Sequence, residues 1–244
     1  MKVVSGDSTR ADAWSAALGK GPADALLTDP PYCLLTRRRK KGDLRQPKGK
    51  KNEGPEVRRF ESVREYRDFT QGWMRHAAAF TRPEATWVVW TNLLGKAPIL
   101  ECAAELGWHH LWGEFTWAKR TREANSGEEL LRVVEVALVL ARTPLPALSD
   151  ADPPRCWAAV AGYDDDGEAK RWGSHPNHKP FGVLEPLVRQ WTRPGQRVID
   201  PFAGSGSIPM AAEQLGREAA CIELSGEWVE RIGVRARAAA GAKP

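Results

Sequence analysis

The sequence RVIDPFAGSGSIPMAAEQL, residues 197–215, contains a short apolar run, a glycine-rich turn and a helix-like pattern in that order. Glycines at a helix start let backbone N–H groups approach a ligand closely, although Gly204-Ser205-Gly206 alone also fits a plain tight turn. The turn is not a dinucleotide fingerprint, because the third glycine of G-x-G-x-x-G would fall at Pro209. It also lacks the Lys-Ser/Thr pair of a phosphate-binding loop, which argues against NTP hydrolysis.

Short apolar runs alternate with amphipathic stretches along the chain, which predicts an α/β fold: a mostly parallel, seven-stranded sheet with helices on both faces. The expected strands are Lys2–Ser5, Ala25–Thr28, Thr86–Thr91, Glu114–Trp117, Val133–Ala141, Arg197–Asp200 and Ala219–Glu223. The expected helices lie near Thr9–Leu18, Val63–Phe80, Pro98–Leu106, Phe181–Trp191, Ser207–Leu215 and Gly226–Ala238. Prolines and acidic residues break the alternation over 142–173, where we expect an irregular insertion or a small subdomain.

The motif DPPY, residues 29–32, follows another apolar run. Prolines end a strand because they lack an N–H and fix the backbone, so a carboxylate and an aromatic ring are held in fixed relation there. Four acidic residues end apolar runs in this way: Asp7, Asp29, Asp200 and Glu223. Because open α/β sheets bind ligands beyond the carboxyl ends of their strands, these acids predict one lined crevice.

The length of 244 residues suits one domain spanning 1–244. No stretch approaches the ~20 apolar residues of a membrane span, and the first residues do not resemble a signal peptide. The four cysteines form no Cys-x-x-Cys pair, which favours a reducing cytoplasm. The five histidines show no ligand-like spacing with the cysteines, so we expect no metal site.

The net charge of +5, with a pI near 9.1, is concentrated in one segment. Residues 33–60 carry eleven basic side chains against three acidic ones, which leaves the remainder of the chain net negative by three. Such a run indicates either a solvated, mobile loop or a phosphate-binding segment, and a mobile loop can also become ordered on a polyanion.

Three motifs in order, DPPY (29–32), HPNHKP (175–180) and DPFAGSG (200–206), resemble the circularly permuted beta class of amino-group DNA methyltransferases. In that family the catalytic motif precedes the cofactor motif, as it does here. The segments GDS (6–8), FTWAKR (115–120), VEVALVLAR (134–142) and EQLGREAACIEL (213–224) extend the resemblance over most of the chain. The resemblance implies the Rossmann-like methyltransferase fold, S-adenosylmethionine as cofactor and an exocyclic base amine as methyl acceptor.

The resemblance also assigns roles by position. The implied catalytic residues are Asp29, Pro30, Pro31 and Tyr32. The implied cofactor-binding residues are Asp7, Asp29, His175, Lys179, Pro180, Asp200, Phe202, Ala203, Gly204, Ser205, Gly206 and Glu223. Among them, Glu223 would take the ribose hydroxyls and Asp7 the adenine end. The expected nucleic-acid contacts are Arg37, Arg38, Arg39, Lys40, Lys41, Lys48, Lys50, Lys51, Arg58 and Arg59.

An exocyclic amine is a poor nucleophile, so an enzyme must draw its lone pair out of the ring. The Asp29 carboxylate and the Pro30 carbonyl can each accept one N–H, and Tyr32 can stack on a base extruded from the duplex. Aspartate at position 29 favours adenine N6, because cytosine-N4 members of the family more often carry serine there. Cytosine N4 is the alternative, followed by a non-catalytic nucleic-acid binder of the same fold or an RNA or protein amine methyltransferase.

Double-stranded DNA is the expected partner, and no membrane partner is expected. Target recognition would fall to segment 142–173 and to the basic loop 33–60. The sequence leaves open a homodimer, a cognate restriction nuclease, the target sequence, and whether the enzyme belongs to a restriction-modification pair or acts alone.

Overall fold

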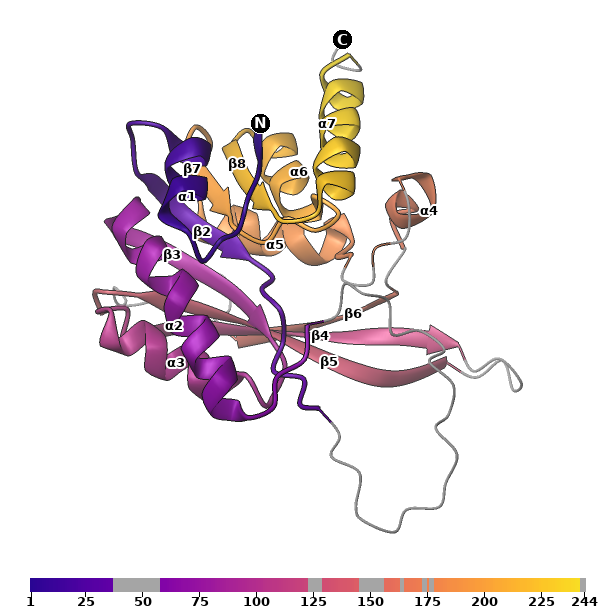
Figure 1. Ribbon diagram of the computed structural model, residues 1–244. Coiled ribbons are helices and arrows are strands. Elements are labelled where there is room, and N and C mark those ends of the chain that lie inside the picture. The colour runs from indigo at the N-terminus through magenta and orange to yellow at the C-terminus, as the bar shows by residue number, and fades with distance from the viewer. Residues whose placement is uncertain are drawn as a thin grey trace.

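An eight-stranded sheet runs through the protein in the order β1-β8-β7-β2-β3-β5-β4-β6 (Figure 1). This computed structural model describes residues 1–36, 58–122, 129–144, 156–162, 165–172, 175 and 178–241. The strands are β1 (Lys2–Ser5), β2 (Ala23–Thr28), β3 (Thr81–Thr91), β4 (His110–Arg122), β5 (Glu129–Ala141), β6 (Cys156–Gly162), β7 (Arg197–Asp200) and β8 (Glu218–Glu223).

Most neighbouring strands are parallel, which confirms the predicted sheet type. β1, β8, β7, β2 and β3 form a continuous parallel half. β5 runs antiparallel to both β3 and β4, and β6 lies parallel to β4 at the edge. Parallel strands need covered faces, because their connections place helices over both sides.

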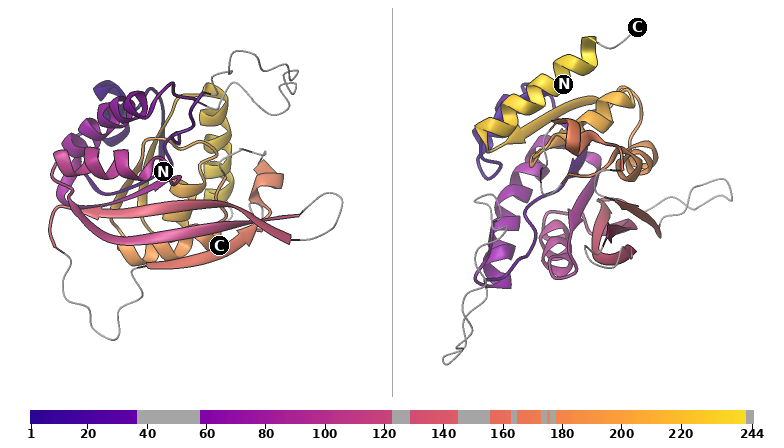
Figure 2. Two further views of the ribbon diagram at one scale, coloured as in Figure 1. Left: turned by 90° about the horizontal axis from the view of Figure 1, so that it is seen from below. Right: turned by 90° about the vertical axis from the view of Figure 1, so that its right-hand side faces the viewer.

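Helices cover both faces of the sheet (Figures 1 and 2). One side carries α1 (Ala11–Leu18), α2 (Val63–Phe80) and α3 (Lys96–Glu105), and the other carries α5 (Phe181–Trp191), α6 (Ser207–Gln214) and α7 (Gly226–Gly241). A short helix, α4 (Glu168–Trp172), precedes α5. The predicted helices are therefore confirmed with small shifts at their ends.

The central strands are buried on both faces, so their residues alternate between two cores. On β3, Trp87 packs toward α1–α3 and Trp90 packs toward α5 and α6, and both are fully buried. On β2, Leu26 faces the first core and Leu27 the second. The sequence of a strand buried on both faces is a continuous apolar run, and this run is the signal that predicted β2.

The expectation of irregular structure over 142–173 is wrong in part, because β6 and α4 lie within it. β6 pairs with β4 from Glu114↔Cys156 to Arg120↔Gly162, which adds an eighth strand to the seven predicted. Its sequence, CWAAVAG, is rich in alanine and glycine, which are disfavoured in strands, so the sequence gives little strand signal. β4 and β5 are also longer than predicted and extend beyond the helices (Figure 2).

The start of α2 shows the capping expected from Ser62 and Glu65. Ser62 Oγ accepts a hydrogen bond from the Glu65 backbone N–H at 3.1 Å. Glu65 Oε2 accepts one from the Glu61 N–H at 2.6 Å, one residue before the usual position in a capping box. The cap fixes where α2 begins, and Tyr66 and Phe69 of α2 belong to the same core as Cys33, the residue after the DPPY motif.

We expect Ser62→Ala to lower the free energy of unfolding by about 1 kcal/mol, because an orphan N–H at the helix start loses its acceptor. Urea unfolding followed by circular dichroism measures the change. Ser15→Ala, at an exposed interior position of α1, is the matched control and should leave stability equal or slightly higher. Equal losses in the two variants would show that the Ser62 cap does not stabilise α2.

Candidate active site

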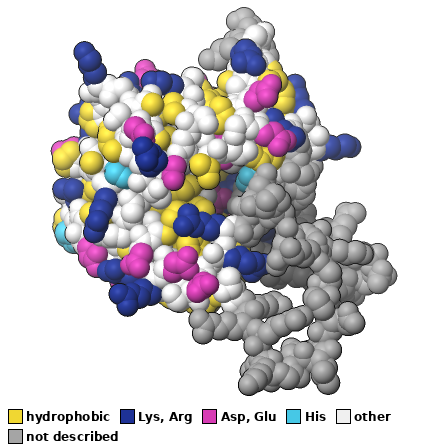
Figure 3. All heavy atoms as spheres, in the orientation of Figure 1, with side chains coloured by type: hydrophobic (Ala, Val, Ile, Leu, Met, Phe, Trp, Pro, Cys, Tyr) yellow, Lys and Arg dark blue, Asp and Glu magenta, His cyan; other side chains and the backbone are white. Residues whose placement is uncertain are grey.

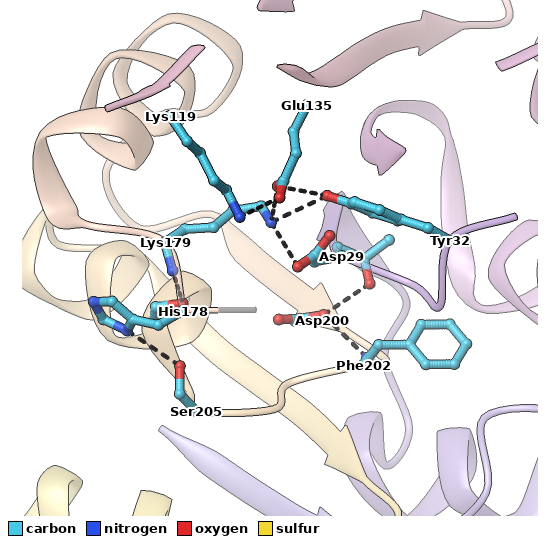
Figure 4. Close-up of polar contacts among 11 residues, drawn as sticks. Asp29, Tyr32, Lys119, Glu135, His178, Lys179, Asp200, Phe202 and Ser205 are labelled. Atoms are coloured by element: carbon cyan, nitrogen blue, oxygen red, sulfur yellow. Dashed lines mark hydrogen bonds and ion pairs between the residues drawn. The ribbon is translucent and has the colours of Figure 1, made fainter. Parts of the chain in front are cut away.

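The tips of β2 and β7 bring the two main motifs together. The strands are parallel neighbours, with Ala25 opposite Val198 and Leu26 opposite Ile199. Asp29, just after β2, and Asp200, at the end of β7, therefore lie at the same edge of the sheet. Thr28 Oγ1 donates a hydrogen bond to Asp200 Oδ1 at 2.8 Å, which links the motifs across 172 positions of sequence (Figure 4).

A pocket lies between these two motifs and encloses about 270 Å³ of unfilled space, part of it open to solvent. Seven of the sequence-predicted site residues line it: Asp29, His175, Lys179, Phe202, Ala203, Gly204 and Ser205. Ser207 and Ile208, at the start of α6, complete the lining. Asp29 of the DPPY motif and the glycine turn therefore share one pocket.

The glycine turn needs its glycines. Gly204 and Gly206 have φ angles of +52° and +79°, in the left-handed region that side chains disfavour. A Cβ on Gly206 would lie 2.9 Å from a side-chain carbon of Ile232 on α7. The Gly204 N–H donates to Glu223 Oε2 at 2.7 Å, and buried Arg235 donates to the Ser205 carbonyl at 2.6 Å. Neighbouring elements therefore hold the turn in place.

Within the described part of the chain, two buried carboxylate oxygens at this edge have no hydrogen-bond partner: Asp29 Oδ1 and Asp200 Oδ2. Burial raises the pKa of Asp200 to about 7, although the Phe202 N–H and the Thr28 hydroxyl oppose the rise by donating to Oδ1. Because an unpaired buried acceptor is costly, these two oxygens suit a ligand that carries hydrogen-bond donors or positive charge.

Lys179 lines the pocket, and its side chain reaches the residues around Asp29. Its ammonium lies 2.6 Å from Asp29 Oδ2, 3.0 Å from Glu135 Oε2 and 3.3 Å from the Tyr32 hydroxyl oxygen (Figure 4). The Tyr32 hydroxyl in turn donates to Glu135 Oε2 at 2.7 Å. Lys179 therefore belongs to the cluster around the Asp29 carboxylate.

Sequence reasoning missed Glu135 and Lys119, which complete this cluster. Lys119 on β4 forms an ion pair with Glu135 on β5. Burial opposes ionisation of Glu135, yet the ammonium groups of Lys179 and Lys119 lower its pKa to about 2. The available signal was an acidic residue inside the apolar run VEVALVLA, because a buried acid is rare unless it is paired.

The contacts of the other predicted site residues, and of His175, are as follows. Asp7 follows β1 and accepts hydrogen bonds from the backbone and the hydroxyl of Thr9. The Gly6 N–H donates to the Glu223 carbonyl, so Asp7 and Glu223 end adjacent strands. The His175 ring packs edge-on against Trp228 with centroids 4.6 Å apart. Of the remaining residues, Pro30 is buried, Pro31 is partly exposed, Pro180 caps α5, and Gly206 caps α6.

Eight of the ten predicted nucleic-acid contacts, Arg37 to Lys51, lie outside the described residues. Of the other two, Arg59 is exposed, and the Arg58 guanidinium lies 4.1 Å from the centre of the Phe69 ring. The described ends of the basic segment are hydrogen-bonded to each other: the Thr36 N–H donates to the Phe60 carbonyl and the Phe60 N–H to the Leu34 carbonyl. On the face shown in Figure 3, the described basic and acidic side chains are intermixed.

A family model described as DNA methylase, N6_N4_Mtase, matches residues 23–234. The type II methyltransferase M2.DpnII of Streptococcus pneumoniae is 24% identical over 223 residues, which cover 85% of this chain and 80% of that protein. The Escherichia coli protein YubD is 48% identical over 65 residues, which are 27% of this chain and 28% of that protein.

Solved structures show the same fold. M1.HpyAVI in complex with S-adenosylmethionine has a TM-score of 0.65 at 18% identity, covering 96% of this chain and 98% of that one. The cytosine-N4-specific PvuII DNA methyltransferase also has a TM-score of 0.65 at 18% identity, covering 96% of this chain and 85% of that one.

The chain therefore belongs to the N6/N4 amino-group DNA methyltransferases, enzymes that use S-adenosylmethionine, which confirms the resemblance to amino-group DNA methyltransferases; membership of the permuted beta class stays a prediction. The residues present suit this cofactor, because the glycine turn lines the pocket and the unpartnered oxygens of Asp29 and Asp200 suit a molecule with a sulfonium and an ammonium group. Among the described residues, no helix is both long and apolar enough to cross a membrane. The same part of the chain contains no cluster of three or more residues able to ligate a metal.

We expect Gly206→Ala to lower the free energy of unfolding by about 1–2 kcal/mol and to weaken S-adenosylmethionine binding, because the added Cβ meets Ile232 at an unfavourable φ. Urea unfolding and isothermal titration calorimetry measure both effects. Gly72→Ala is the matched control: its Cβ would have nothing within 4 Å inside α2, so stability should rise by about 0.5–1 kcal/mol. A Gly206→Ala protein as stable as the wild type would contradict this account of the turn.

We expect the affinity for S-adenosylmethionine to increase with pH up to about 7, the pKa of Asp200, by up to about tenfold per pH unit. The affinity falls at lower pH because, below this pKa, the free protein holds a proton on Asp200 that a cationic ligand must displace. Calorimetric titrations over a pH series measure the slope. Asp200→Asn should bind more weakly and lose the slope, whereas a slope that persists in Asp200→Asn would assign it to another group.

Proposed function

We propose that the protein transfers the methyl group of S-adenosylmethionine to an exocyclic amino group of a base in double-stranded DNA, with adenine N6 as the favoured acceptor. The observation that carries the proposal is the Asp29 carboxylate, which has one unpartnered buried oxygen and lines the same pocket as Phe202, Gly204 and Ser205. A hydrogen-bond acceptor for the amine and a seat for the methyl donor are therefore adjacent.

The cofactor seat is proposed from the described contacts. Asp200 Oδ2 is free to accept a hydrogen bond from the cofactor's ammonium group. Glu223 uses each carboxylate oxygen once, for the N–H groups of Gly204 and Ser225, which leaves acceptor capacity for the ribose hydroxyls. Asp7, beside Glu223 at the end of the adjacent strand, is placed toward the adenine end.

The chemistry requires the amine lone pair to leave conjugation with the base. Asp29 Oδ1 and the Pro30 carbonyl, on consecutive residues, accept the two N–H bonds and turn the amine out of the ring plane. Bound S-adenosylmethionine supplies an electrophilic methyl group on a positively charged sulfur. Positive charge then develops on the amine, and a carboxylate ~4 Å away at an effective dielectric of ~20 stabilises it by up to ~4 kcal/mol before desolvation, about a thousandfold in rate.

Tyr32 supports the target base in this proposal. A base inside a duplex is inaccessible, so it must be flipped out and stacked on an aromatic surface. The Tyr32 hydroxyl is held between Glu135 and Lys179, which fixes the ring beside Asp29, and the residue remains partly exposed. Burial, followed by the nearby carboxylates of Asp29 and Glu135, raises the pKa of Tyr32 well above its usual value, so its hydroxyl stays protonated as a donor.

Adenine is favoured over cytosine because an aspartate, and not a serine, occupies position 29.

Contacts with the DNA are assigned to the basic segment and to residues 142–173. The described start of the basic segment, Leu34–Thr36, begins two residues after Tyr32 and is hydrogen-bonded to Phe60. Trp172, with Arg171 near its ring at 4.9 Å, is the described aromatic residue of 142–173 that we propose for contact with DNA.

Labelled S-adenosylmethionine incubated with unmethylated duplex DNA tests the proposal. Digestion to nucleosides and mass analysis should identify N6-methyladenine, and N4-methylcytosine would correct the target base. We expect Asp29→Ala to lose about a thousandfold or more in rate while it still binds the cofactor. Asp12→Ala, at an exposed position on α1, is the control and should keep full activity. Transfer to RNA and to no DNA, or no transfer to any DNA tested, would refute the proposed function.

A further inference from the structure

We infer that Lys179 is a positioning residue that sets both the orientation and the charge of the Asp29 carboxylate, and that Glu135 and Lys119 hold the Lys179 ammonium in place for this purpose. The inference rests on the proposed function, because it gives a partner to the carboxylate that receives the amine. It assigns to Lys179 a role at the acceptor amine, in place of contact with the cofactor.

The ammonium of Lys179 has no hydrogen-bonding capacity to spare. It has three N–H donors, and three acceptors lie within hydrogen-bond distance: Asp29 Oδ2, Glu135 Oε2 and the Tyr32 hydroxyl oxygen. The Tyr32 hydroxyl can accept from Lys179 because its own proton goes to Glu135. A ligand in the pocket could receive a hydrogen bond from Lys179 only if one of these contacts broke.

The surroundings of Lys179 keep the ammonium fixed. Its side chain is 1% exposed, and its Nζ lies 4.7 Å from the centre of the Trp90 ring and 5.9 Å from that of Trp117. Removing an ammonium from water costs several kcal/mol unless carboxylates and aromatic faces compensate. The compensation here comes from Asp29 and Glu135 together, so the position of Lys179 and the ionised state of both acids depend on one another.

In this arrangement the two oxygens of Asp29 have different roles. Lys179 occupies Oδ2, while Oδ1 is buried without a partner in the pocket lining. The ion pair thus holds the carboxylate in one orientation and leaves one oxygen for an amine N–H. Lys119 pairs with Glu135 Oε1, the oxygen that Lys179 does not contact. The two lysines and the two acids, Asp29 and Glu135, therefore have a net charge of zero before a neutral base binds.

The charges around Asp29 determine how its ionisation should respond to substitution. Burial raises the pKa of Asp29, the Lys179 ammonium opposes that rise, and the Glu135 carboxylate adds to it. The other charged or titratable groups on the packed elements are Tyr32, Lys119 behind Glu135, and Asp200, whose pKa Asp29 itself helps to raise. Removing the ammonium should therefore raise the pKa of Asp29, and removing the charge of Glu135 should lower it.

Two near-isosteric variants, Lys179→Met and Glu135→Gln, test the inference through the pH dependence of methyl transfer. In Lys179→Met the loss of activity on acidification should move up by about one to three pH units, with a rate at neutral pH about tenfold or more below wild type. In Glu135→Gln the loss of activity on acidification should move to lower pH. A purely structural role would lower the rate in both variants without shifting either profile, and unshifted profiles would overturn the inference.

Infrared spectroscopy of the protein alone separates this inference from the proposed function, because it needs no DNA and no activity. At neutral pH Asp200 already contributes a protonated carboxyl band. Lys179→Met should show an additional band of this kind, which is absent from wild type and disappears in Lys179→Met/Asp29→Asn. If Lys179→Met does not fold, as judged by circular dichroism, Glu135→Gln decides alone. An Asp29 pKa in Glu135→Gln at or above the wild-type value would overturn the inference, whether or not the enzyme methylates DNA.

Discussion

The hydrogen bond from Thr28 to Asp200 is the contact on which the site depends, because it joins the strand that leads into the DPPY motif to the strand that leads into the glycine turn. The parallel pairing of β2 with β7 makes that contact available. Parallel neighbours present their carboxyl ends at one edge, so side chains distant in sequence meet there without any long loop. The glycine turn and the DPPY turn differ in chemistry, yet both occupy the space directly beyond these two strands.

The site also concentrates buried charge, which a protein stabilised only by packing would avoid. Asp29, Glu135 and Lys179 lie within hydrogen-bond distance in a nearly dry environment, and Asp200 is buried without any cationic partner. If hydrogen bonds and ion pairs fully compensated the burial of these carboxylates, no acceptor oxygen would be free. Within the described residues, however, one oxygen each of Asp29 and Asp200 remains unpaired. Unpaired buried polar atoms at one edge of the sheet are expected where a ligand completes their hydrogen bonds.

The sequence predicted the parts of this architecture that local chemistry dictates. Proline and glycine mark where strands end, so the positions of Asp29 and Asp200 at strand tips could be inferred, and so could α2 and α5 to the residue. The direction of the Lys179 side chain could not, because it depends on the approach of β5, and Glu135 was overlooked inside an apolar run. β6 was missed because alanine-rich edge strands carry weak signals, and it forms only by pairing with the extended β4.

The most direct test of the central claim is a crystal structure of the protein with S-adenosylmethionine, or an inert analogue of it, and a duplex that contains the target base. The account predicts a flipped base whose amine nitrogen lies about 3–3.5 Å from the methyl carbon, or from its counterpart in the analogue, with the cofactor against Gly204–Gly206 and Asp29 Oδ1 accepting one amine N–H. A cofactor bound away from the glycine turn, or an amine held by groups other than Asp29 and Pro30, would contradict it.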